Sequence, residues 1–282
     1  MIIDFRVRPP FKGYLKDYLY TDIESIDQYL SPKYGARVSA SALHRSLEEL
    51  VQEMIQWDVV KACVPIRRAD NPESTNEDLI DLLQVYPEQF IGMAGLDVQD
   101  TVTALQEIEQ YVVQGPCQGV LLEPSIYKNQ KALYADDKER MYPLYEKLEK
   151  ENILTAITFG GLGSPDTTYY MPQVIDQVVR DFPKLRIVVC HGGWPWVTQI
   201  CALAFERDNL YICPDIYQLN VPGCHEYVQA ANYILQDKIL YGTTYPLISM
   251  QDGIRCYRSS GFKPDVLEKV LYHNAARLLG LE

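Results

Sequence analysis

Two arginines, Arg6 and Arg8, stand two residues apart in the first strand-like run of the sequence, and Asp4 stands two residues before them. Residues two apart in a β-strand point to the same face, so the three side chains are expected together. A guanidinium is permanently charged, and its N–H fork matches the two oxygens of a carboxylate. If that face lies inside the fold, the pattern predicts a site for a carboxylate-bearing small molecule. An internal salt-bridge network with Asp4, Glu123 or Asp215 is the alternative.

The segment CHGGWPW, residues 190–196, offers an acid or base. His191 directly follows an apolar run, and the two glycines after it let the backbone pass close to a ligand. An imidazole in such a place can transfer protons near neutral pH. Asp215 follows the next apolar run, where a carboxylate could orient the imidazole. We predict His191, Asp215 and Arg8 as the catalytic residues.

Other polar and aromatic side chains also follow strand-like runs. In a barrel of parallel strands, the carboxyl ends of the strands form the face that carries the active site. A packing role for Trp194 and a role for Glu123 as an arginine partner are alternatives to substrate contact. The predicted substrate-binding residues are Arg6, Arg8, Arg67, Glu123, Thr158, Trp194, Tyr217, Thr244 and Tyr245. Surface or capping positions are expected for His44, His225 and His273.

The elements that must position these residues follow from the hydrophobic pattern. Short apolar runs alternate with amphipathic stretches such as Ser46–Trp57 and Val174–Phe182, which is typical of parallel strands that are each followed by a covering helix. Eight such runs predict a single-domain (β/α)₈ TIM barrel over residues 1–282, which a helix at Val266–Leu279 completes. The predicted strands are Ile2–Val7, Val59–Pro65, Phe90–Leu96, Gly119–Leu122, Leu154–Thr158, Leu185–Cys190, Leu210–Cys213 and Ile239–Gly242.

The connection after the first predicted strand is long, about 35 residues, and connections of that length in compact domains are usually functional or disordered. Its aromatic content argues against disorder. We expect it to form a lid or a dimer contact over the barrel mouth, although a packed loop without substrate contact fits equally well. A second long connection, Gly160–Met171, is expected at the same mouth. The tyrosines of the first connection are Tyr14, Tyr18, Tyr20, Tyr29 and Tyr34.

Composition limits the partners. The formal net charge of −12 argues against nucleic acid and anionic membranes, because phosphate neutralisation requires a basic surface. No run approaches the roughly 18 apolar residues of a membrane span, and the first residues lack a signal-peptide pattern, so a cytoplasmic protein is expected. The 7 cysteines form no CxxC pair, which indicates reduced, mostly buried thiols.

Four motifs resemble a known family. IIDFRVRPP at residues 2–10 resembles the opening IIDxHxHxxP motif of the amidohydrolase 2 branch of the amidohydrolase superfamily. CHGGWPW resembles the strand-six histidine motif of that branch, YGTTYP at 241–246 its GTDYP motif, and HNAARLLGL at 273–281 its closing helix. The branch includes aminocarboxymuconate semialdehyde decarboxylase-like enzymes and pyrone dicarboxylate lactonases. The resemblance implies the distorted amidohydrolase type of barrel over nearly the whole chain.

The departures from the family pattern concern its metal ligands. By the resemblance, Arg6 and Arg8 replace the two strand-one ligands, Thr158 the strand-five ligand and Thr244 the strand-eight aspartate, while His191 is kept. A catalytic divalent metal normally needs three protein ligands with lone pairs, and arginine has no acceptor atom. We therefore expect no metal and no other cofactor.

The residues and the resemblance together predict a metal-independent hydrolase of a small carboxylated, lactone-like substrate. Arg6 and Arg8 would bind its carboxylate or stabilise the developing oxyanion, while His191 and Asp215 would activate water. The alternatives are a decarboxylase or hydratase of an unsaturated carboxylic acid, and a non-catalytic barrel that binds a carboxylated metabolite. A displaced metal held by His191, Asp215 and Glu123 is a further alternative. A homodimer is expected from the aromatic first connection.

Overall fold

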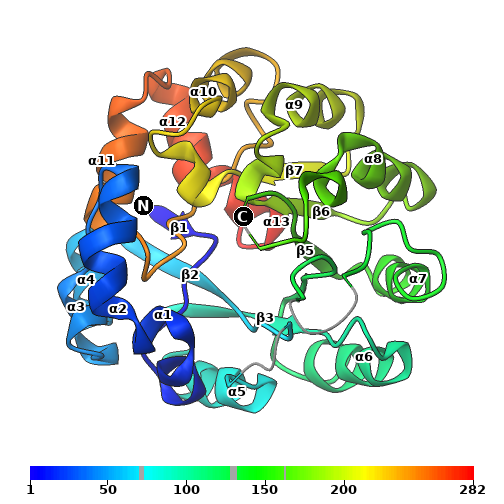
Figure 1. Cartoon of the computed structure of the whole chain (residues 1–282), viewed down its shortest axis with the longest axis horizontal. Coiled ribbons are helices and arrows are strands. Elements are labelled where there is room, and N and C mark those ends of the chain that lie inside the picture. The colour runs from blue at the N-terminus through cyan, green and yellow to red at the C-terminus, as the bar shows by residue number, and fades with distance from the viewer. Residues whose placement is uncertain (70–72, 128–131, 162) are drawn as a thin grey trace.

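Seven parallel strands in chain order, β1 to β7, curl around a central axis, and helices cover their outer side (Figure 1). The computed structural model describes residues 1–69, 73–127, 132–161 and 163–282. Each strand pairs with its successor in parallel, as the buried apolar runs predict. The strands are β1 Ile2–Asp4, β2 Val59–Pro65, β3 Phe90–Gly95, β4 Gly119–Leu122, β5 Leu154–Thr158, β6 Ile187–Cys190 and β7 Leu210–Cys213.

The eighth predicted strand, Ile239–Gly242, lies in its expected place between β7 and β1 but is not a regular strand. On the β7 side, Leu240 N–H donates to the carbonyl of Ile212 at 2.8 Å. On the β1 side, Phe5 N–H donates to the carbonyl of Tyr241 at 3.0 Å, and the Arg8 N–H donates to that of Tyr245. These bonds connect the two edges of the sheet, so the distorted TIM barrel expected from the sequence is confirmed.

The Asp4 carboxylate explains why regular pairing stops at this seam. The N–H of Thr243 donates to Asp4 Oδ1 at 3.0 Å, in place of a carbonyl of the neighbouring strand. The N–H of Arg6 also donates to Asp4 Oδ1, at 3.1 Å. The predicted first strand, Ile2–Val7, ends at Asp4 as a regular strand, because the Arg6 N–H donates to a side chain, while the Phe5 and Val7 N–H groups still donate to backbone carbonyls.

The outer layer contains the predicted helices with small shifts. The region expected as Ser46–Trp57 is α4, Leu47–Gln56, whose first turn is capped by the Ser46 hydroxyl accepting from Glu49 N–H. The last predicted helix is α12 Pro264–Glu268 followed by a π-helical turn and α13 Asn274–Leu278. The other covering helices are α5 Asn76–Val85, α6 Thr101–Glu107, α7 Tyr142–Lys150, α8 Pro172–Asp181, α9 Val197–Glu206, α10 Cys224–Tyr233 and α11 Met250–Ser259.

The connection after β1 is a chain of short helices rather than an irregular loop: α1 Tyr18–Thr21, α2 Ile23–Ser25 and α3 Ala40–Leu43, joined by 3₁₀ and π turns. It is the dark-blue segment at the left of Figure 1. Its contacts reach the strand ends: the Tyr20 hydroxyl donates to the Arg8 carbonyl at 2.7 Å, and Ser31 donates to that of Leu247 at 2.6 Å. These bonds place the segment against residues that follow the strands, while its role as a lid or dimer contact stays a prediction.

All 7 cysteines are free thiols, and six of them are buried. Cys190 and Cys213 are register partners in β6 and β7 and belong to one buried apolar cluster, in agreement with the expected buried thiols. None of the described helices is both long and apolar enough to cross a membrane.

Candidate active site

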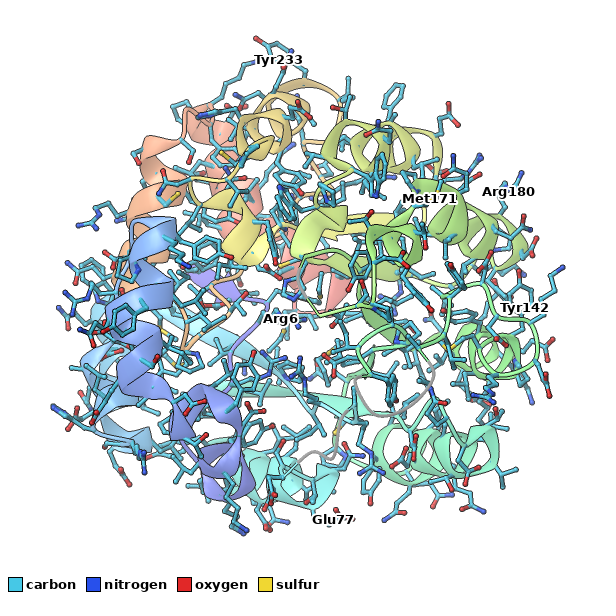
Figure 2. All side chains as sticks on the ribbon, in the orientation of Figure 1. Arg6, Glu77, Tyr142, Met171, Arg180 and Tyr233 are labelled. Carbon is cyan, nitrogen blue, oxygen red and sulfur yellow. The ribbon has the colours of Figure 1, made fainter. Side chains whose placement is uncertain are left out.

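Arg6 extends across the inside of the barrel. Its side chain is 1% exposed, and its Nη2 donates to the Thr158 hydroxyl at the end of β5, at 3.3 Å. Its Nε lies 3.8 Å from Oδ2 of Asp215, which follows β7. Figure 2 shows Arg6 near the centre of the ring of strands. The inward orientation expected from the sequence is therefore confirmed for Arg6, whose Nε and Nη1 have no hydrogen-bond partner among the described residues.

Arg8 is also buried, with 5% of its surface exposed. Within the described ranges, its Nε and Nη2 lack hydrogen-bond partners. Burial, followed by the charges of Arg6 and Arg67, lowers the pKa of Arg8, and Glu123 opposes this effect. A buried guanidinium with unpaired donors is costly, so the arrangement has the character of a binding site for an anion.

Glu123 is held among the arginines. Its Oε2 lies 3.3 Å from Nε of Arg67, and its Oε1 accepts a hydrogen bond from Thr158 at 3.3 Å. Burial alone would raise the pKa of this carboxyl, but Arg67, Arg8 and Arg6 together hold it below its usual range. Glu123 is thus an ionised partner of the guanidiniums, the role preferred for it from the sequence.

His191 and Asp215 form a hydrogen-bonded pair. Nδ1 of His191 lies 2.8 Å from Oδ1 of Asp215, and the backbone N–H of His191 donates to Oδ2 at 3.0 Å. The carboxylate has only acceptors, so the ring proton belongs on Nδ1 and Nε2 carries a lone pair. Burial lowers the pKa of His191, and Arg6 adds to this effect against the opposing charge of Asp215. At neutral pH the imidazole is therefore an uncharged base.

Three residues that follow strand-like segments have left-handed backbone conformations: His191 with φ 65°, Asp215 with φ 46° and Thr244 with φ 58°. This conformation costs about 1–2 kcal/mol for a residue with a Cβ atom and tends to occur at functional sites. Gly193, with φ 71°, is required for another reason, because a Cβ there would lie 2.3 Å from Cγ1 of Ile200. The fold thus holds His191, Asp215 and Thr244 in strained backbone conformations that fix the directions of their side chains.

Aromatic rings lie beside the histidine. The Tyr217 ring meets that of His191 edge to face, with centroids 5.2 Å apart, and stacks on Trp194 at the same centroid distance. Trp194 Nε1 donates to the carbonyl of Pro222 at 2.9 Å. Trp194 is positioned by packing, while Tyr217 lies next to the base.

The remaining predicted residues have different surroundings. Thr244 is 2% exposed, and its hydroxyl lacks a partner within the described ranges, so it is available to a ligand. The Tyr245 hydroxyl is engaged with Ser41 of the covering segment at 2.8 Å, and its role in substrate binding stays a prediction.

Asp4 does not pair with the arginine side chains. Its carboxylate accepts from the Thr243 hydroxyl at 2.6 Å and from two backbone N–H groups, and no guanidinium of the described residues forms an ion pair with it. The salt-bridge alternative is therefore wrong for Asp4 and correct for Asp215, which pairs with Arg6, whereas Glu123 pairs with Arg67 rather than with Arg6 or Arg8. Burial raises the pKa of Asp4 to about 7.

Two contacts were not foreseen from individual residues. The Tyr18 ring lies 5.8 Å from Cζ of Arg67, and the Tyr20 hydroxyl bonds the Arg8 carbonyl. The aromatic composition of the first connection was the only signal for them.

The other histidines are exposed as expected: His44, His225 and His273.

A sequence model of the amidohydrolase 2 family matches residues 55–281. The chain belongs to this family. The chain is similar to an uncharacterised TIM-barrel protein from Bordetella bronchiseptica, with 35% identity and a TM-score of 0.92. The match covers 99% of this chain and 98% of that protein. It is 21% identical to a 2-amino-3-carboxymuconate-6-semialdehyde decarboxylase of Dictyostelium discoideum over 249 residues, which are 76% of this chain and 67% of the relative.

A manganese-bound dihydroxybenzoic acid decarboxylase from Polaromonas has a related fold, with a TM-score of 0.71, 16% identity, and coverage of 99% of this amidohydrolase and 97% of that chain. The residues of this amidohydrolase do not fit such a metal. No group of three or more His, Cys, Asp or Glu side chains able to hold one occurs in the described part of the chain. The alternative of a displaced metal at His191, Asp215 and Glu123 is therefore wrong for these residues: Asp215 holds His191, and Glu123 pairs with Arg67.

Proposed function

We propose that this amidohydrolase is a metal-independent hydrolase that opens a small, carboxylated, lactone-like ring. The observation that carries the proposal is the combination of His191, whose Nδ1 is held by Asp215, with buried guanidinium N–H groups that lack partners among the described residues. The partnerless groups are donors, which suits an anionic ligand and an oxygen that gains charge during the reaction.

The proposed reaction begins with water near Nε2 of His191. Its oxygen attacks the lactone carbonyl carbon, one of its protons passes to Nε2, and the carbonyl π electrons move onto oxygen. Guanidinium donors stabilise this oxyanion, and Asp215 stabilises the imidazolium. When the oxyanion collapses, the ring C–O bond breaks, and the proton on Nε2 passes to the leaving oxygen. The products are a hydroxy acid, or its keto tautomer, and the unchanged enzyme.

Decarboxylation is the second candidate, because the Dictyostelium relative and the Polaromonas structure both bear that activity in their names. An arginine cluster suits binding of the carboxylate in either reaction. Decarboxylation, however, needs a proton for the carbon that loses carbon dioxide, and an uncharged His191 with its proton on Nδ1 has none to give at Nε2. The site chemistry therefore favours hydrolysis.

Purified protein treated with a strong chelator and then assayed on a panel of carboxylated lactones tests the proposal. We expect ring opening that is unchanged by the chelator and by added Mn²⁺ or Zn²⁺, and no carbon dioxide release from unsaturated carboxylic acids. Loss of turnover on chelation, or carbon dioxide as the product, would overturn it. Ligand-induced thermal stabilisation without turnover would instead favour a non-catalytic binding protein. The cytoplasmic location and the homodimer stay predictions.

A further inference from the structure

Arg6 and the catalytic pair share one carboxylate. Asp215 lies 2.8 Å from Nδ1 of His191 through Oδ1, and 3.8 Å from Nε of Arg6 through Oδ2. The two cationic or potentially cationic groups therefore flank the same side chain, which is 0% exposed. Arg6 is close enough to His191 for its charge to lower the pKa of the imidazole.

Arg6 is also fixed at its far end. Its Nη2 donates to the Thr158 hydroxyl at the end of β5, which in turn donates to Glu123, the residue after β4, so one side of the fork is held in place. Its Nε and Nη1 lack hydrogen-bond partners in the described part of the chain. A donor held in place before the reaction stabilises developing charge without reorganisation, which is the requirement for an oxyanion site.

Arg8 has different surroundings. It makes no ion pair with a carboxylate among the described residues, and its own carbonyl is bound by Tyr20 of the covering segment. The nearby charges that act on it are those of Arg6, Arg67, Glu123 and Asp17, and Asp215 is not among the main ones. Arg8 thus differs from Arg6 in that it forms no ion pair with Asp215 among the described residues, although its charge, like that of Arg6, lowers the pKa of His191.

On these contacts, and resting on the proposed function, we propose that the two arginines divide the work: Arg6 stabilises the oxyanion that forms during ring opening, while Arg8 binds the substrate carboxylate. This differs from the sequence expectation, in which Arg8 is both catalytic and substrate-binding and Arg6 is substrate-binding. The substrate class is a lactone ring that carries a carboxylate on a ring atom other than the attacked carbonyl carbon, so that both guanidiniums are engaged at once.

Two probes separate the roles without turnover. Tetrahydropyran-2-carboxylate has a ring and a carboxylate but no ester, and a cyclic phosphonate monoester bearing the same carboxylate adds a charged tetrahedral centre that mimics the oxyanion. Calorimetric titration should give Arg8→Met at least a tenfold loss of affinity for both probes. Arg6→Met should lose at least tenfold for the phosphonate and under threefold for the simple carboxylate. Arg68→Met is the matched control, because Arg68 pairs with Glu107 at 2.9 Å outside this cluster.

The same variants on a hydrolysed lactone should show a lower kcat for Arg6→Met, by about 10²–10³, and a higher KM for Arg8→Met. If a Met variant fails to fold, the corresponding Lys variant, Arg6→Lys or Arg8→Lys, is measured in its place, because lysine keeps the positive charge. Equal losses for both probes in both variants, or no binding of either probe by the wild type, would overturn the division of roles. Binding that depends on Arg8 and Arg6 as stated, without hydrolysis of any lactone, would instead reject the proposed reaction and leave the assignment of the two anion positions in place.

Discussion

The guanidinium of Arg6 begins beside the first strand and ends 3.3 Å from the hydroxyl of Thr158 on the fifth, with three strands between them in the sheet order. By the family resemblance, both positions belong to metal ligands. Here a permanent cation with hydrogen-bond donors lies between them. Such a group can stabilise negative charge, but it cannot lower the pKa of a bound water as a metal does, so the base must be a protein side chain.

The Asp215→Asn substitution should lower kcat by about 10²–10⁴, a usual range for loss of acid–base function. An amide can donate to Nδ1 of His191, which moves the ring proton to Nε2 and removes the acceptor for the water proton. Steady-state kinetics with a hydrolysed lactone measures the effect, and His225→Asn on exposed surface is the control. A kcat within threefold of the wild type would show that this pair does not activate water.

The pH dependence of kcat/KM should have a single acid limb whose midpoint lies below about 6.5, the unperturbed pKa of histidine. Burial first, and then Arg6, lowers the pKa of His191, so the base stays unprotonated to lower pH than a free histidine. In Arg6→Met the limb should move to higher pH, because a nearby cation is gone. A limb that does not move would mean that another group titrates.

Asp4 should make the protein less stable as pH rises from about 4 to 8. Its pKa is raised from 3.8 to about 7 in the folded chain, so the folded state binds this proton more tightly than the unfolded state. That preference is fully present below the unfolded value and is lost as pH passes the folded one. Its full size is about 4 kcal/mol.

Urea unfolding of the wild type and Asp4→Asn at several pH values isolates this effect, because His191 contributes to both proteins alike. The wild-type free energy of unfolding, relative to that of the variant, should fall with rising pH. Parallel curves would show that Asp4 is ionised in the folded protein throughout this range.

The Tyr20→Phe substitution should destabilise the protein by about 1–3 kcal/mol, because it leaves the buried carbonyl of Arg8 without the Tyr20 hydroxyl. Since that bond joins the covering segment to the arginine itself, KM for the carboxylated substrate should rise as well. Tyr29→Phe, on the same segment with 61% of the tyrosine exposed, is the matched control and should change neither quantity. A KM equal to that of the wild type would separate the covering segment from substrate binding.

The sequence was sufficient for the barrel, for its strand positions and for the inward orientation of Arg6. Buried parallel strands leave a local mark, a short apolar run, and residues two apart on such a strand share a face. Motifs such as CHGGWPW likewise placed His191 at a strand end. These features depend on neighbours along the chain, which is why they can be read from it.

Only the tertiary structure decided the hydrogen-bond and ion-pair partners of the charged side chains. Asp4, two residues from Arg6, turns to Thr243, whereas Arg6 reaches Thr158, 152 residues away, and Asp215. The covering segment was expected as a loop and is helical, and its tyrosines reach Arg8 and Arg67. Electrostatic and hydrogen-bond energies depend on distance and burial in space, and these are fixed only when remote strand ends come together.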